Sequence, residues 1–556
     1  MRYKKWWEKA IVYQIYPRSF KDTDGNGIGD IEGIIEKLDY VESLGVNTIW
    51  INPMTLSAQE DNGYDATDYK KIDPLFGTDE DGARLIEEIH KRNMKVIYDF
   101  PLNHTSDQHP WFKEALKGKD NPYRDYYIWT DGKENEAYPN NWLAAFGGSA
   151  WSKELNSDQY YLHLFKKSMP DTNWDHPPLR QEMAEVLNYW IEKGIDGFRL
   201  DAFVYIDVDK KLPDHPNETG QGQDMNEHGE NIQKYLSEMN EAIQHKEKEV
   251  FIVGEATGAD VETTNWYTEP DRNIVDKIIT MYYFQDDEDE IDESVPEDMQ
   301  HLALDFKAFK DVQKKFQEGQ KENGGPLLYW SNHDIPRAQH KYGDMENYRD
   351  NTVKMMATML YLQKGIPIIY YGEEIGMKNV AFDDPSNIED AGTMDFYQKA
   401  REAGWDHNKT MHHINLSGRD VARGIMQWED SEKIGFSEGV PWTLFNRESV
   451  YNVKDQEEDE ESILHFYRKL IALKKTELFQ EGSYEMKETT DSVYAYERKL
   501  KGKRALVCSN FSDKSANLSL DKEWNKEQLV LQNEGNTFEK DELHLSPYCT
   551  VVFIKE

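Results

Sequence analysis

The chain of 556 residues carries 105 acidic and 65 basic side chains, a formal net charge of −40, and 38% of its residues are hydrophobic. This charge repels nucleic acids and anionic membranes, so we expect neither as a partner. No run of about 18 apolar residues and no signal peptide are recognisable, and two cysteines (Cys508, Cys549) are too few for a disulfide framework. We expect a cytoplasmic monomer.

Short apolar runs recur along the chain, each followed by polar residues and then a helix-like stretch. Eight such runs occupy residues 10–17, 46–53, 94–101, 194–203, 249–256, 276–284, 325–334 and 365–374. One intervening helical face is formed by Met183, Val186, Leu187, Trp190 and Ile191. Eight alternating strands and helices predict an α/β fold, a (β/α)8 TIM barrel.

Two connections are long enough to fold by themselves. About seventy residues follow the third strand, which predicts an inserted subdomain, and residues 377–460 form a second excursion after the eighth strand. From Ser483 the apolar period changes to two, which predicts a C-terminal antiparallel β domain. The expected domains are a first barrel segment (residues 1–103), subdomain B (residues 104–174), a second barrel segment (residues 175–482) and the β domain (residues 483–556). The acidic run Gln285–Glu293 is interpreted as a solvated loop.

Charged residues occur at the ends of several predicted strands. Arg199 and Asp201 share one face of a strand that is otherwise apolar, and Glu255 and Asp334 end two other strands. Each residue alone could belong to a structural ion pair in the barrel. Because barrel enzymes place their chemistry at the carboxyl ends of strands, and glycoside hydrolysis uses paired carboxylates, the whole set favours a glycosidase.

The environments of these carboxylates suggest different protonation states. Asp201 should stay ionised, as a nucleophile must, because Arg199 is adjacent. Glu255 has apolar neighbours, and burial there should raise its pKa and suit it to donate a proton. Asp334, beside His333, offers a third carboxylate for a positively charged transition state.

The sequence resembles the α-amylase family of glycoside hydrolases along nearly its whole length. Four short motifs carry the resemblance: "DFPLNH" (Asp99–His104), "GFRLDA" (Gly197–Ala202), "GEA" with Glu255, and "NHD" (Asn332–Asp334). Their order and spacing are most similar to the oligo-1,6-glucosidase and α-glucosidase branch.

The resemblance implies a role for each matching residue. Asp201 would be the nucleophile, Glu255 the acid/base and Asp334 the transition-state stabiliser of a retaining exo-α-glucosidase. The residues implied around the glucose that is cleaved off are Asp61, Tyr64, His104, Phe165, Arg199, His333 and Arg419. The substrate would be a short gluco-oligosaccharide.

Three positions differ from what this branch usually has. Met169 stands where a glutamine is expected near the sugar, and Met54 ends an "INPM" segment in which a Ser-Pro pair is common. Ala202 follows the nucleophile where 1,6-specific members have valine. The smaller residue predicts a preference for α-1,4 links, such as those of maltose.

The segment "DTDGNGIGD" suggests a metal-binding loop after the first strand. Oxygen ligands at Asp22, Asp24, Asn26 and Asp30, with the carbonyl of Ile28, match alternate positions of a calcium loop. Similar loops in this branch hold Ca²⁺ or Mg²⁺ away from the chemistry, and no organic cofactor is implied. A metal-free Asp/Gly turn is the alternative.

Other functions remain open at this stage. Within the family, the alternatives are an oligo-1,6-glucosidase, a trehalose-6-phosphate hydrolase, and a sucrose isomerase or transglucosylase. A non-catalytic barrel that binds a partner is a different class, and the intact set of Asp201, Glu255 and Asp334 argues against it.

Overall fold

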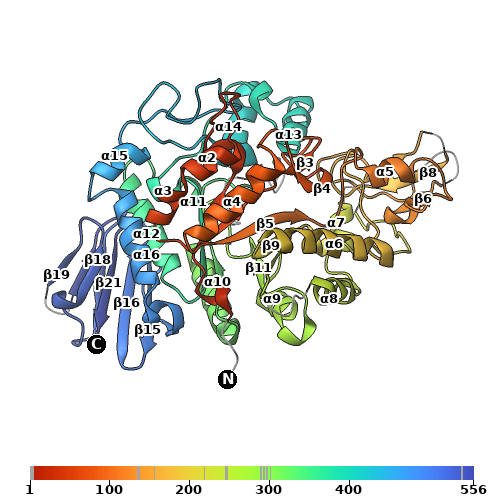
Figure 1. Cartoon of the computed structure of the whole chain (residues 1–556). Coiled ribbons are helices and arrows are strands. Elements are labelled where there is room, and N and C mark those ends of the chain that lie inside the picture. Colours follow the sequence, from red (N-terminus) through yellow and green to blue (C-terminus); the bar gives the residue numbers. More distant parts are fainter. Residues whose placement is uncertain are drawn as a thin grey trace.

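The computed structural model describes residues 5–133, 138–155, 157–217, 220–243, 248–287, 291, 295, 299–300, 302–539 and 542–556. Its centre is a sheet of eight parallel strands: β1 (Val12–Ile15), β2 (Thr48–Ile51), β5 (Lys95–Pro101), β9 (Gly197–Asp201), β10 (Phe251–Glu255), β11 (Lys277–Ile279), β12 (Leu327–Leu328) and β13 (Ile366–Tyr370). They pair in the order β11–β10–β9–β5–β2–β1–β13–β12, which forms a nearly closed barrel (Figure 1). Each of the eight apolar runs contains one strand, so the predicted TIM barrel is confirmed.

Helices connect the barrel strands and cover the outside of the barrel (Figure 1). The helices of this part of the chain are α1 (Pro17–Phe20), α2 (Ile31–Glu36), α3 (Leu38–Ser43), α4 (Asp79–Lys91), α6 (Pro177–Lys193), α7 (Gly222–Asn226), α8 (Ile232–Ile243), α9 (Val261–Thr268), α10 (Phe306–Gly319), α11 (Ala338–Tyr342) and α12 (Arg349–Tyr361). Of these, α7 and α11 lie at the carboxyl end of the barrel, where their residues line a pocket. Thr78 and Asp81 form a capping box at the start of α4. Gly194, with φ of 118°, ends α6 in the left-handed region.

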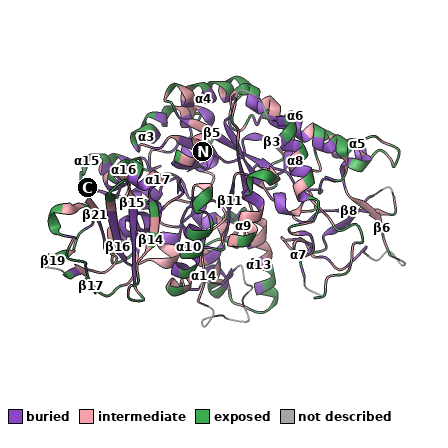
Figure 2. Ribbon diagram, turned by 90° about the horizontal axis from the view of Figure 1, so that it is seen from below, coloured by how far each residue is buried: buried purple, intermediate pink, exposed green. Residues whose placement is uncertain are grey.

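Side chains of the barrel strands alternate between the helices and the barrel interior. On β9, Phe198 and Leu200 belong to the core that lies against the helices. Arg199 instead borders the interior, beside Trp50 and Ile97. The strands at the centre of Figure 2 are accordingly buried, and Arg199 and Asp201 face the inside of the barrel, where a charged face requires partners.

Two segments extend the barrel near its carboxyl end. After β2, a hairpin of β3 (Thr55–Ser57) and β4 (Ala66–Ile72) is formed. After β5, the expected inserted subdomain contains α5 (Pro110–Ala115) and an antiparallel sheet of β6 (Trp129–Asp131), β8 (Gln159–Leu162) and β7 (Trp151–Lys153). Trp142, Trp151 and Tyr160 give this subdomain a core of its own.

The C-terminal part begins with a second excursion and ends in the β domain. The excursion after β13 contains α13 (Ala391–Glu402), α14 (His407–Ser417) and α15 (Val453–Glu458), and α16 (Ile463–Lys474) and α17 (Glu477–Glu481) follow. The β domain has a sheet of β14 (Ser483–Met486), β15 (Val493–Leu500), β16 (Lys503–Asn510), β21 (Thr550–Lys555) and β18 (Leu529–Gln532). A smaller sheet contains β17 (Ala516–Ser519), β20 (Glu542–Leu545) and β19 (Thr537–Glu539). The paired strands are antiparallel, as predicted.

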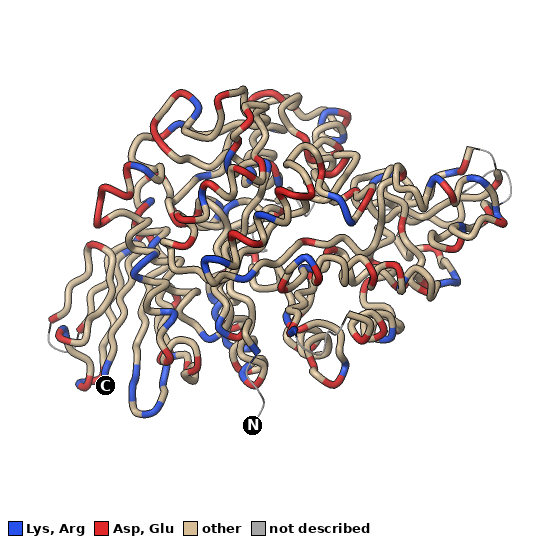
Figure 3. Tube along the Cα trace, in the orientation of Figure 1, with Lys and Arg blue, Asp and Glu red and all other residues tan. Residues whose placement is uncertain are grey.

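Acidic residues occur along the whole trace (Figure 3). Residues 288–290 and 292–293 of the acidic run lie outside the described residues, so its role as a solvated loop stays a prediction. No described helix has the length and apolar character needed to cross a membrane. Cys508 and Cys549 are both free and buried.

Candidate active site

A cavity of about 780 Å³ lies at the carboxyl ends of the barrel strands. Eight of the ten predicted catalytic and substrate residues line it: Asp61, Tyr64, His104, Phe165, Asp201, Glu255, Asp334 and Arg419. The other two, Arg199 and His333, are buried and contact the carboxylates of this cavity. The inserted subdomain contributes Phe146 to the lining and the second excursion contributes Asp390. The structure therefore brings the predicted set together in one pocket.

Arg199 lies among four carboxylates at the base of this pocket. One terminal nitrogen, Nη1, lies 2.7 Å from Asp99 Oδ1 and 2.6 Å from Asp201 Oδ1. The other, Nη2, lies 2.6 Å from Glu255 Oε1 and 3.9 Å from Asp334 Oδ2. The charged pair on β9 is thus part of the pocket and not an isolated structural ion pair.

Sharing one cation changes the protonation expected for Asp201. Burial raises the pKa of Asp201 to about 6, although Arg199 opposes this shift. The sequence showed only Arg199 beside Asp201, whereas in the structure Arg199 also contacts Asp99 and Glu255 and the neighbouring carboxylates repel the charge of Asp201. Burial raises the pKa of Glu255 further, to about 7, in the predicted direction. Near neutral pH, Asp201 is mostly ionised while much of Glu255 keeps its proton.

Asp334 lies in more positive surroundings than the other two carboxylates. Burial alone would raise its pKa, but His333, Arg419, Arg423 and Arg199 together lower it well below its usual range. His333 Nε2 lies 3.0 Å from Asp334 Oδ2, and Arg423 Nη2 lies 3.5 Å from Oδ1. This carboxylate therefore stays ionised and can stabilise positive charge that develops on a bound group.

The remaining predicted substrate residues surround the pocket with polar and aromatic groups. Both ring nitrogens of His104 are buried without a hydrogen-bond partner among the described residues, and its ring packs edge-on against Phe165 at 5.1 Å. Burial lowers the pKa of His104 to about 4, so the ring is neutral. Tyr64 stacks on His333 with ring centroids 5.6 Å apart. Burial raises the pKa of Asp61 to about 6.

Sequence reasoning missed several residues that build the site. Asp99 is recognisable as a strand end but not as a partner of Arg199, and its Oδ2 accepts hydrogen bonds from Trp50, Asn52 and Tyr64. Arg423, which contacts Asp334, lies four residues after Arg419 in the same 3-10 helix. In the sequence, Asp99 can be recognised as a polar residue in an apolar strand, whereas nothing in the sequence indicates the role of Arg423.

The three atypical positions have different places in the structure. Ala202 lines the pocket, and its φ of 51° and ψ of 21° are left-handed. Met169 and Met54 are buried and do not line the pocket in the described part of the chain. Of the three, only Ala202 lines the pocket among the described residues.

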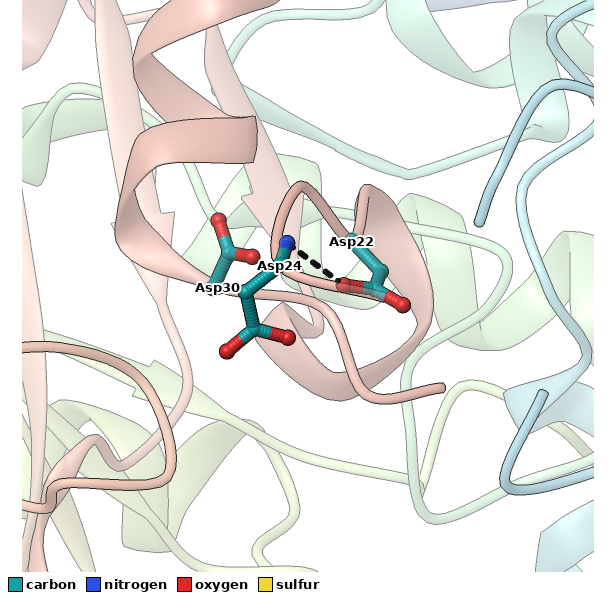
Figure 4. Close-up of side chains that lie close together, drawn as sticks. All are labelled: Asp22, Asp24 and Asp30. Atoms are coloured by element: carbon teal, nitrogen blue, oxygen red, sulfur yellow. Dashed lines mark hydrogen bonds between the residues drawn. The ribbon is translucent and has the colours of Figure 1, made fainter. Parts of the chain in front are cut away.

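The predicted metal loop brings three carboxylates together (Figure 4). One oxygen from each of Asp22, Asp24 and Asp30 lies within 4.8 Å of the others. Asp22 Oδ1 accepts the backbone N–H of Asp24, and Asn26 Oδ1 accepts that of Ile28. These oxygen donors fit a hard cation, which would relieve the repulsion between the carboxylates.

The loop is held in a tight conformation beside the second excursion. Gly27 has φ of 90°, and a Cβ atom there would overlap the carbonyl oxygen of Val440. Asp22 Oδ2 accepts hydrogen bonds from Gly27 N and from Ser437. Lys21 Nζ donates hydrogen bonds to the backbone carbonyl oxygens of Asp22 and Phe436. Its hydrogen bonds therefore do not go to the three carboxylates of the loop.

The barrel, its two excursions and its carboxylate site define a glycosidase of the α-amylase type. Residues 14–482 match the family "Alpha amylase, catalytic domain", and residues 493–552 match "Alpha-amylase SusG C-terminal domain". The chain belongs to the alpha-amylase family of glycoside hydrolases.

Individual relatives narrow the class to an α-glucosidase-type hydrolase. The chain is 42% identical to oligo-1,6-glucosidase of Bacillus cereus, over 99% of each protein. It is 43% identical to oligo-1,6-glucosidase of Halalkalibacterium halodurans, over 91% of this chain and 90% of that protein. The crystal structure of trehalose-6-phosphate hydrolase from Bacillus licheniformis superposes with a TM-score of 0.90 at 37% identity, over 99% of this chain and all of the other.

Proposed function

We propose that the protein is a retaining exo-α-glucosidase that releases α-glucose from the non-reducing end of short gluco-oligosaccharides, with α-1,6 links preferred. The observation that carries this proposal is the sharing of Arg199 by Asp201 and Glu255. Two carboxylates on one guanidinium are close neighbours, and a narrow separation is typical of retaining enzymes. Their different pKa values suit one to attack and the other to donate a proton.

In the first step, Asp201 Oδ attacks the anomeric carbon while Glu255 gives its proton to the oxygen of the leaving sugar. The glycosidic C–O bond breaks, and a covalent ester to Asp201 forms. In the second step, Glu255 removes a proton from water, which attacks the same carbon, releases Asp201 and restores the α configuration. Asp334 stabilises the positive charge that develops on the ring in both transition states.

The pocket supports binding of one glucose unit beside these groups. We assign the ring face to Tyr64 and Phe165 and the hydroxyl groups to Asp61, His104, His333 and Arg419. Aromatic faces and a few placed polar groups are what a sugar site requires. His104 lines the pocket, and its ring nitrogens have no side-chain hydrogen-bond partner among the described residues, which supports a contact with a substrate hydroxyl.

The linkage proposal rests on the relatives. Both oligo-1,6-glucosidases match at more than 40% identity, and the preference for α-1,4 links that Ala202 predicted finds no support among them. The left-handed backbone at Ala202 affects how its side chain borders the pocket, so its small size is a weak guide to linkage.

Hydrolysis of a phosphorylated disaccharide is the second candidate, because of the similarity to trehalose-6-phosphate hydrolase. Electrostatics disfavours it. Among the described residues, the lining contains six carboxylates (Asp61, Asp201, Glu255, Asp286, Asp334, Asp390) but only Lys341 and Arg419 as cations. Lys341 is also engaged, because its Nζ lies 3.5 Å from Asp286. An anionic substrate would therefore be repelled.

One set of initial rates tests these proposals. The substrates are isomaltose, maltose, maltotriose, sucrose, trehalose and trehalose-6-phosphate at equal concentration. We expect isomaltose to be cleaved fastest and trehalose-6-phosphate least. If maltose is cleaved faster than isomaltose, the enzyme prefers α-1,4 links and the linkage proposal is wrong. If trehalose-6-phosphate is cleaved fastest, the substrate is a phosphorylated disaccharide. If no substrate is cleaved, a binding role is favoured.

We further propose that Asp22, Asp24, Asn26, Asp30 and the carbonyl of Ile28 hold a structural Ca²⁺ or Mg²⁺. The close approach of three carboxylates supports this proposal. A cation there would fix the loop between β1 and α2, and the catalytic carboxylates would not depend on it. Loss of the cation should therefore weaken the fold and leave the chemistry intact.

A further inference from the structure

We propose that Gln14, on β1 beneath the pocket, is a positioning residue that fixes the tautomer of His333 and so keeps the ring proton on Nε2, the nitrogen that lies beside Tyr64 and Asp334. Gln14 is fully buried and does not line the pocket in the described part of the chain. It acts through His333 and does not touch the reacting atoms. The kinetic part of this inference rests on the proposed function, whereas the tautomer does not.

The polarity of the network is set at Asp99. An ionised carboxylate only accepts hydrogen bonds, and the indole N–H of Trp50 and the guanidinium of Arg199 only donate. Trp50 Nε1 lies 3.1 Å from Asp99 Oδ2, and Arg199 Nη1 lies 2.7 Å from Oδ1. Asn52 must therefore turn its amide nitrogen toward Asp99 Oδ2, at 3.2 Å, and its oxygen away.

The orientation of the Asn52 amide determines the orientation of the Gln14 amide. Asn52 Oδ1 lies 3.0 Å from one terminal atom of Gln14, and only a donor satisfies that oxygen. The atom is therefore the amide nitrogen of Gln14, which lies 3.0 Å from His333 Nδ1 as well. The amide has two N–H groups, one for each partner. His333 Nδ1 accepts the second, so the ring proton must reside on Nε2.

The proton on Nε2 points at the catalytic side. His333 Nε2 lies 3.0 Å from Asp334 Oδ2 and 2.5 Å from the hydroxyl oxygen of Tyr64. Tyr64 donates its own proton to Asp99 Oδ2 at 3.0 Å, so its oxygen can accept. The other tautomer would turn a ring lone pair toward the Asp334 carboxylate, which is repulsive. Burial lowers the pKa of His333 to about 3, so the ring is neutral and its tautomer matters.

The side-chain oxygen of Gln14 lacks a hydrogen bond, which suggests that the residue is present for its amide nitrogen. Its Oε1 is buried without a hydrogen-bond partner among the described residues. Leaving a buried acceptor unpaired is costly, and an apolar side chain of the same size would avoid this cost. An apolar residue could not replace the amide nitrogen, which donates hydrogen bonds to both Asn52 and His333.

The direct test is ¹⁵N NMR of the full-length protein labelled at histidine, with His333→Asn used to assign the His333 signals. We expect Nδ1 to give the resonance of an unprotonated nitrogen and Nε2 that of a protonated one. Gln14→Glu replaces the donor by an acceptor, and both ring nitrogens should then become protonated. A proton on Nδ1 in the wild type, or an unchanged His333 spectrum in Gln14→Glu, would overturn the proposal.

Kinetics supplies a second, independent readout with isomaltose as substrate. We expect Gln14→Glu to lower kcat ~100-fold, because a second ring proton makes His333 a cation that competes with the positive transition state for Asp334. Gln14→Met should lower kcat ~5-fold, with smaller changes in KM. Gln363→Met is the matched control, since Gln363 is equally buried and donates to Met359 O away from the pocket. It should leave kcat and the His333 spectrum unchanged.

A double-mutant cycle separates positioning from a general structural effect. In a His333→Ala background, Gln14→Met should lower kcat no further, because Gln14 acts only through the ring. If Gln14→Met lowers kcat by the same factor with and without His333, the proposal fails. If the NMR tautomer is as expected but no glucoside is hydrolysed by the wild type, the proposed function fails and the tautomer assignment stands.

Discussion

The pH dependence of kcat/KM follows from two carboxyl groups of the pocket. Activity in the proposed mechanism requires Asp201 to be ionised and Glu255 to be protonated in the free enzyme. Burial raises the pKa of Asp201 to about 6 and that of Glu255 to about 7. Raising the pH through about 6 therefore creates the nucleophile, and raising it through about 7 removes the proton donor. A narrow bell with its maximum near pH 6.5 is expected.

The size of the effect follows from these two values. With pKa values of about 6 and 7, roughly 60% of the enzyme has the correct protonation at pH 6.5, and about 3% has it two units to either side. The expected fall is therefore about 20-fold at pH 4.5 and at pH 8.5. Since the groups share Arg199, the two limbs describe the coupled set and not single residues.

The assay measures glucose released from isomaltose well below KM, from pH 4 to pH 9, with enzyme shown to be folded at each pH. Glu255→Gln with α-glucosyl fluoride is the control, because fluoride leaves without a proton. That variant should lose the alkaline limb and keep the acidic one. A constant kcat/KM for isomaltose between pH 7 and pH 9 in the wild type would refute the role of Glu255 as proton donor.

Three further predictions concern the nucleophile, the metal loop and a buried carboxyl. Asp201→Asn should lower turnover at least ~10³-fold with the fold retained, and proton NMR of the wild-type reaction should show α-glucose first; early β-glucose would contradict retention. Asp22→Ala, or chelation of the wild type, should lower Tm while the remaining folded enzyme keeps its turnover; loss of activity without unfolding would make the metal catalytic. Burial raises the pKa of Asp171 to about 8, so the wild type should lose stability as pH rises from about 4 to 8, on the order of 5 kcal/mol at most, and Asp171→Asn should not. Tm measured at pH 5 and pH 9 tests this, and equal loss in both proteins would contradict it.

The barrel could be predicted from sequence because its strands are buried on both sides. Such strands are short continuous apolar runs, and a polar residue at the end of a run is conspicuous. Asp201, Glu255 and Asp334 are recognisable from the sequence alone for this reason. The C-terminal domain is visible for a related reason, since antiparallel strands alternate with a period of two.

The surroundings of these residues could not be predicted in the same way. Gln14, Asn52 and Trp50 lie in apolar strands that give no sign of which side chains meet across the barrel. Contacts in this network, among them those of His333 and Asp99, join residues 35 to 319 positions apart. The upward shift of the Asp201 pKa could not be predicted for the same reason: the sequence shows Arg199 beside Asp201 but not that Glu255 and Asp99 contact the same guanidinium.

The shared arginine also explains how one glutamate can serve both steps of the proposed mechanism. The negative charge of Asp201 is one of the causes that raise the pKa of Glu255, and Arg199 opposes it. When Asp201 forms the glycosyl ester its charge disappears, and Arg199 is left with one carboxylate fewer to balance. The pKa of Glu255 must then fall, because a repulsion is removed while the cation remains. Glu255 is therefore a proton donor while Asp201 is ionised, and its lower pKa after the ester forms keeps it deprotonated for the second step. The same geometry thus turns an acid into the base that activates water.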